Sequence, residues 1–103
     1  MIRDFTLAVY RQLLDQLQAA GFSFQTFAEF LRAPASKTVL LRHDIDARKS
    51  HALTFAKIQQ ERGIKGTYYF RLVPQSFDED IIREIHGMGH EVGYHYEDMD
   101  FAG

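Results

Sequence analysis

The sequence predicts a single α/β domain, in which about three parallel strands follow a pair of N-terminal helices. The first reason is the order of the hydrophobic patterns, which alternate between helical and strand spacing as ααβαβαβ along the chain. The second is the crossover rule, because strands joined by helices pair in parallel and wind in one hand. The third is size: 103 residues, 46% of them hydrophobic, suffice for one domain with a buried core. We therefore divide the chain into a helical cap, residues 1–35, and a βαβαβ unit, residues 36–103.

The helical cap is predicted from apolar spacing and from capping residues. Thr6 is an expected N-cap for a helix over residues 7–20, and Gly21 can supply its left-handed stop. The apolar face of this helix is formed by residues at steps of three and four: Leu7, Tyr10, Leu14 and Leu17. Thr26 opens a capping-box pattern, which predicts a second, short helix to about Arg32.

Three strands are predicted in the remaining chain. Residues 38–41 form a short β-branched and aliphatic run, typical of a buried parallel strand. Residues 65–71 are rich in β-forming aromatic residues, and residues 91–94 form the third strand. The third strand is expected to leave an exposed edge near the carboxyl terminus, which a second copy of the chain could cover.

Two helices are predicted between these strands. Ser50 is the expected N-cap of the first, which runs to Arg62 before Gly63. Ser76 opens a second capping-box pattern, and the helix that follows ends at Gly87. Each helix carries apolar residues at helical spacing, so each can cover one face of the sheet.

Composition excludes several classes of function. The formal net charge is −2 and the basic residues are interleaved with acidic ones, so a nucleic-acid partner is not expected. Because the chain has no cysteine, a metal site must use histidine and carboxylate ligands. We expect no membrane span and no signal peptide, and therefore a cytoplasmic protein.

Polar residues follow the first and third predicted strands. Asp44 and Asp46 come after residues 38–41, and His95 comes after residues 91–94. The carboxyl ends of parallel strands share one edge of a sheet, and neighbouring strands lie about 4.8 Å apart, so these side chains can converge. Imidazole with one or two carboxylates is an ordinary ligand set for zinc and related metals. One carboxylate can bind the ion while the other takes a proton from an attacking water.

Three short segments carry a resemblance to a known family. Residues 41–46 read LRHDID, residues 66–71 read GTYYFR, and residues 89–95 read GHEVGYH. In this order they resemble the NodB-like polysaccharide deacetylases, also called carbohydrate esterase family 4. The resemblance implies a metal-dependent N-deacetylase of acetylated amino sugars on a distorted (β/α) barrel, of which this chain would form a partial barrel.

The resemblance also implies roles for individual residues. Asp44 matches the catalytic base of the family's first motif, and Asp46 matches its metal-binding acid. His95 matches the first histidine of the second motif. The cofactor is then a divalent metal, with zinc the first choice, and the substrate is an acetylated carbohydrate. A soluble sugar or a nucleotide- or lipid-linked precursor would fit a cytoplasmic location.

The third metal ligand departs from the family pattern. The family's second histidine is replaced here by Met99. Glu97, Asp98 and Asp100 are the nearby carboxylates. If this segment turns into a helix, Asp98 lies about one turn from His95 and is the best substitute.

Three further residues are candidates for substrate contact. Arg71 ends the second strand on the site side, where it binds substrate or pairs with an acid. Tyr94 and Tyr96 either line the sugar pocket or belong to the core. His43, which points away from Asp44 if the strand continues, and His90, which precedes the third strand, are expected to have structural roles.

Two alternative functions remain open. The family's later motifs, including the acid for the leaving amine, would lie beyond Gly103, so turnover by this chain is expected to be weak or nil. The first alternative is therefore a metal- or carbohydrate-binding or assembly module without turnover. The second is an aspartate-nucleophile phosphotransferase, which also has Asp-x-Asp after a strand. That family expects Thr or Val where this sequence has Arg48.

Overall fold

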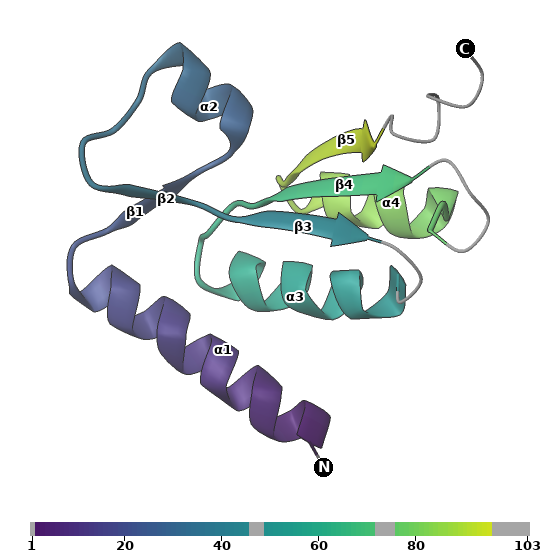
Figure 1. The fold of residues 1–103 in the computed structure, drawn as a ribbon, viewed down its shortest axis with the longest axis horizontal. Helices are drawn as coiled ribbons and strands as arrows, with labels where there is room; N and C mark the ends of the chain where they lie inside the picture. The colour runs from purple at the N-terminus through teal and green to yellow at the C-terminus, as the bar shows by residue number, and fades with distance from the viewer. Residues whose placement is uncertain (1, 46–48, 72–75, 96–103) are drawn as a thin grey trace.

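The computed structural model describes residues 2–45, 49–71 and 76–95 (Figure 1). Along the chain the elements are α1 (Ile2–Ala19), β1 (Ser23–Gln25), α2 (Phe27–Arg32), β2 (Thr38–Leu40), β3 (Arg42–Ile45), α3 (Lys49–Glu61), β4 (Thr67–Arg71), α4 (Glu79–Gly87) and β5 (Glu91–His95). The α/β class expected from the sequence is therefore confirmed.

A three-stranded parallel sheet in the order β3-β4-β5 is the centre of the fold. Its register pairs Asp44 with Tyr69 and Tyr69 with Gly93. The last pair joins Arg71 to His95. The three strands therefore run toward the same edge, as the crossover rule predicts. The described residues form no closed barrel.

The predicted strand over residues 38–41 is found as β2, over residues 38–40, but it belongs to a separate two-stranded sheet, and the strand that pairs with β4 begins only at Arg42. Thr38–Leu40 pairs in parallel with Ser23–Gln25, a strand that the sequence analysis assigned to the helical cap and did not predict. The chain then leaves this small sheet at Leu41, which packs against the cluster around Leu14, and enters β3. Asp44 consequently lies inside a strand and not in the loop after it.

The two faces of the three-stranded sheet are covered unequally. Helices α3 and α4 both pack on one face, as Figure 1 shows, and the core between them contains Ile45, Ala52, Ala56, Tyr68, Phe70, Ile82 and Ile85. On the other face, α2 covers the amino end of the strands, where the Phe27 amide donates to Thr67 Oγ1 at 3.3 Å. Strand alternation puts Asp44 and Tyr69 on this second face.

Helix α1 packs mainly against α3, and its Tyr10 also contacts His43 of β3, with 6.5 Å between the ring centroids. Leu14 on α1 is fully buried in a small cluster with Ile58 and Ile64. At its border, Arg62 Nε donates to Asp15 Oδ1 at 2.7 Å. None of the helices within the described ranges has both the length and the apolar character of a membrane span.

Capping predictions were right at one helix and wrong at three. Thr26 forms the expected capping box with Glu29 at the start of α2. Thr6 lies inside α1, because that helix already begins at Ile2. Ser50 lies in the first turn of α3, which begins one residue earlier.

The third correction concerns Ser76, because Asp78 is the N-cap of α4. The Ser76 hydroxyl is buried and serves a different purpose. It accepts a hydrogen bond from the Arg71 amide at 2.9 Å and donates one to the Ile45 carbonyl. Ser76 thus joins the carboxyl ends of β3 and β4, which is the edge where the candidate site was expected.

Candidate functional site

The face of the three-stranded sheet opposite α3 and α4, called the open face below, carries Asp44, the candidate base. Arg42 precedes it by two residues on the same face, and Arg42 Nε donates to Asp44 Oδ1 at 3.0 Å. The two side chains are 48% and 50% exposed. An ion pair with this exposure contributes at most about 1 kcal/mol to stability. The ion pair therefore adds little stability, and its main effect is on the position of the Asp44 carboxylate.

The Tyr69 ring of β4 lies on the same face of the sheet, between Arg42 of β3 and Gly93 of β5. The Arg42 guanidinium carbon is 4.6 Å from the centroid of the Tyr69 ring. On the other side, a Cβ built on Gly93 would lie 2.6 Å from Cε1 and 2.8 Å from Cδ1 of that ring. Because real Cβ atoms do not approach so closely, the ring can occupy this place only while residue 93 is glycine. A glycine in a strand thus lets an aromatic ring from the adjacent strand cover it.

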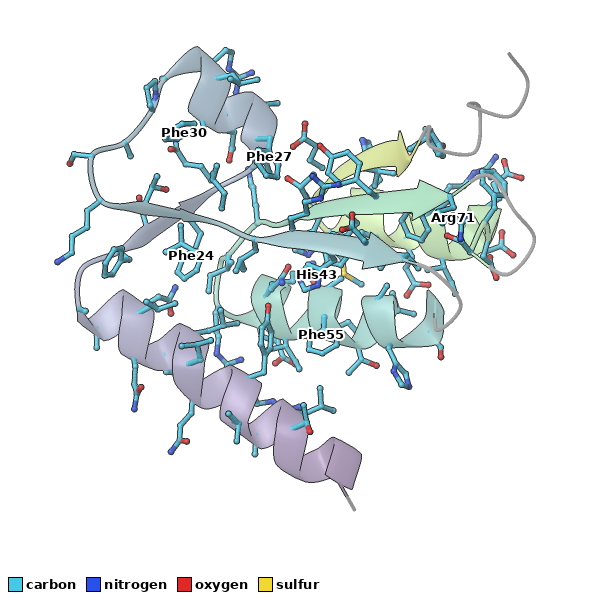
Figure 2. All side chains as sticks on the ribbon, viewed as in Figure 1. Phe24, Phe27, Phe30, His43, Phe55 and Arg71 are labelled. Carbon is cyan, nitrogen blue, oxygen red and sulfur yellow. The ribbon has the colours of Figure 1, made fainter. Side chains whose placement is uncertain are left out.

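Arg71, a candidate substrate contact, ends β4 at the edge that Ser76 secures. Its side chain is half-buried, and alternation along β4 puts it on the face of Tyr69. Figure 2 labels Arg71 at this end of the strand. From this position Arg71 can either bind substrate or pair with an acidic side chain, which are the two roles expected from the sequence.

Tyr94 belongs to the other face. It pairs in register with Phe70 and packs against the core cluster between the sheet and α4. Its ring is stacked with that of Phe77 at 6.2 Å between centroids. This packing favours the core alternative for Tyr94 over contact with a sugar.

The expected metal ligands lie largely outside the described residues. These are Asp46, Asp98 and the other candidate carboxylates, together with the side chain of His95, and Tyr96, a candidate for substrate contact, also lies outside the described residues. Within the described ranges, no group of three or more His, Cys, Asp or Glu residues is placed to bind a metal.

The backbone is compatible with a shared ion. Asp46 follows Ile45 in the sequence, and Ile45 is in register with Phe70 and, through it, with Tyr94, the residue before His95. Strands β3 and β5 are two strand spacings apart, which is about 10 Å. A carboxylate and an imidazole that reach toward each other from such backbones can bring their donor atoms to about 2 Å from one zinc ion, because each side chain extends several ångströms from its Cα.

A buried polar network lies behind the site, on the face covered by α3. Gln59 is fully buried, and its side-chain amide donates to Tyr10 Oη at 2.6 Å. The same amide nitrogen is 2.9 Å from His43 Nε2. Tyr68 Oη donates to Gln59 Oε1 at 2.7 Å. The network therefore joins α1, α3, β3 and β4 through one side chain.

His43 lies on the face opposite Asp44, as alternation predicts. Its ring is stacked on Tyr68, with 4.5 Å between centroids and 9° between planes, and lies beside Phe55 of α3 (Figure 2). Because the Gln59 amide nitrogen carries only donors, His43 Nε2 must accept and the ring is neutral. Burial, and next the proximity of His90, lower the pKa of His43 to about 4.

His90 is buried at the amino end of β5, as expected from the sequence. Its Nδ1 accepts from the Gly66 amide at 2.9 Å, so its Nε2 donates to the Ala56 carbonyl at 2.9 Å. Burial also lowers the pKa of His90. Both core imidazoles are thus held neutral, and the His90 ring also joins the backbone of α3 to that of Gly66 just before β4.

Sequence reasoning missed four residues that shape the site: Arg42, Gln59, Tyr69 and Gly93. The sequence did contain a signal for the contact between Tyr69 and Gly93. A glycine inside a strand, next to a strand rich in aromatic residues, suggests that an aromatic ring covers the glycine. That signal needs the strand register, which the sequence did not supply. Gln59 gave no signal, since a glutamine in a helix is ordinarily exposed.

Comparisons of the chain with protein-family models, with curated proteins and with solved structures found no match. The resemblance to the NodB-like deacetylases therefore rests on the three motif segments alone.

Proposed function

We propose that this chain is a metal-dependent, deacetylase-like hydrolase that acts on N-acetyl groups of carbohydrates. The site is the edge where β3, β4 and β5 end. The observation that supports this most directly is the parallel order β3-β4-β5, which brings Asp44, Arg71 and the backbone of His95 to neighbouring strands at one edge. Sites of α/β proteins form at such edges.

The residues have distinct roles in this proposal. Asp46, His95 and Asp98 bind a divalent cation, with zinc the ion that this donor set favours. When bound, zinc supplies a Lewis acid that polarises the acetyl carbonyl and lowers the pKa of a water. Asp44 takes the proton of the attacking water, and its half-exposed position on the open face leaves it accessible. Arg71 lies beside this edge and contacts the sugar.

Metal content and turnover of the purified chain test the proposal. The wild-type chain is expected to bind roughly one zinc ion, as a single open site would. Asp46→Ala and His95→Ala each remove one ligand and are expected to lose the metal. Asp44→Asn keeps the metal but lowers whatever deacetylation of an N-acetylglucosamine oligomer the wild-type chain performs by ~10²-fold or more, because the general base is lost.

Two exposed residues of α4 supply matched controls. Glu84→Ala and His86→Ala remove a carboxylate and an imidazole from exposed positions in the later turns of α4 and should leave zinc content unchanged. A folded wild-type chain that takes up no zinc would contradict the proposal. Zinc binding that depends on Asp46 and His95, but without turnover, would favour the binding-module alternative.

A further inference from the structure

We infer that Arg42 is a positioning residue for Asp44, and that its own position is set by Tyr69 lying on Gly93. The chain of contacts crosses the whole sheet, from β5 through β4 to β3. Its last member is the carboxylate that the proposed function assigns as the base. The assignment of Asp44 as base rests on that proposed function, but the effect of Arg42 on Asp44 does not.

The first step is the contact between Gly93 and Tyr69. The space above Gly93 is filled by the edge of the Tyr69 ring, which a Cβ would meet at 2.6 Å. The rings of Phe27 and Tyr69 lie 6.4 Å apart, so α2 borders the ring at the amino end of the sheet. With neighbours on two sides, the Tyr69 ring has a fixed place on the open face.

The second step is the contact between Tyr69 and Arg42. The guanidinium lies over the ring face at 4.6 Å, within the range of a cation–π contact. A planar guanidinium stacks on an aromatic face, which a lysine ammonium does not reproduce. The ring therefore restricts where the guanidinium lies, and with it the Nε–H group that meets Asp44.

The third step is the hydrogen bond from Arg42 Nε to Asp44 Oδ1 at 3.0 Å. Side chains two residues apart on a strand point to the same face, so a short, direct contact is possible. Because the Asp44 side chain is half-exposed, this hydrogen bond restricts its choice of rotamer. Because a general base must sit within hydrogen-bond reach of the proton it takes, holding Asp44 in one rotamer matters for catalysis.

The rotamer of Asp44 in solution tests this inference directly. In the wild-type chain, side-chain NMR couplings of Asp44 should report one χ1 rotamer. In Arg42→Met, which keeps an unbranched apolar stem but removes the guanidinium, the couplings should average. Arg42→Lys should not restore the single rotamer. A residue with a merely structural role would not change the Asp44 couplings in a folded protein.

Variants of the supporting ring extend the test. Gly93→Ala and Tyr69→Leu should each average the Asp44 rotamer, whereas Tyr69→Phe keeps the ring and should preserve it. Gly87→Ala is the matched control, because a Cβ there meets nothing within 4 Å. Any kcat that the wild-type chain shows with the N-acetylglucosamine oligomer should fall by up to ~10²-fold in Arg42→Met at unchanged KM, as expected for a misplaced catalytic group.

A single Asp44 rotamer that persists in folded Arg42→Met would overturn the inference, as would rotamer averaging in the wild type. Both results are obtained without metal or substrate. Failure of zinc binding or turnover in the wild type would instead count against the proposed function and would leave this result standing.

Discussion

Replacing Gln59 by leucine is expected to lower the free energy of unfolding by about 3 to 5 kcal/mol. The Gln59 side chain is fully buried and bonds three partners: Tyr10, His43 and Tyr68. Leucine fills a similar volume but leaves the partner groups without their bonds. Each buried polar group left in this way costs about 1 to 3 kcal/mol. This loss is a large part of the stability of a small domain.

Urea unfolding of Gln59→Leu at neutral pH measures the effect. Gln60→Leu is the matched control, because Gln60 is the next residue on α3 and is exposed. The control should change stability by less than about 0.5 kcal/mol. Equal effects of the two substitutions would show that the buried network does not hold α1, α3 and the sheet together.

Lowering the pH from 7 to 5 is expected to reduce the free energy of unfolding by about 2 kcal/mol through His43 alone. Burial lowers the pKa of His43 in the folded chain to about 4, from an ordinary value of 6.5. As the pH falls, the unfolded chain therefore binds a proton on His43 near pH 6.5, whereas the folded chain binds it only near pH 4. Stability is fully present above pH 6.5 and is lost as the pH falls toward 4. The lowered pKa of His90 adds an effect of the same sign.

Urea unfolding across this pH range checks the effect. His43→Phe keeps a ring that can stack on Tyr68 but does not titrate, so its stability should depend less on pH than that of the wild type. His86→Gln removes an exposed histidine and should retain the wild-type slope. A wild-type stability that is constant from pH 7 to 5 would show that His43 is not buried in its neutral form.

Much of the fold could be predicted from local signals. The apolar spacing on α1 and the capping box at Thr26 were sufficient, because these signals act within one or two turns. Gly21 and Gly63 have the positive φ angles expected at helix ends. The break at Leu41 could not be predicted, because it depends on packing against α1, which is distant in sequence.

Some features of the candidate site could likewise be predicted from the sequence, and others could not. The opposite placement of His43 and Asp44 follows from strand alternation and could be predicted. The stack of Arg42, Tyr69 and Gly93 could not, because it depends on the register of three strands. Ser76 was assigned to a helix cap from local spacing, whereas tertiary contacts with two strand ends determine its role.

The most direct test of the proposed function is a crystal structure of the zinc-loaded chain, with anomalous diffraction recorded at the zinc edge. A peak bonded to both Asp46 and His95, at about 2.0 to 2.2 Å from each donor atom, is the expected result. Side chains of Asp46 and His95 too far apart to reach one ion, in a well-ordered crystal, would contradict it.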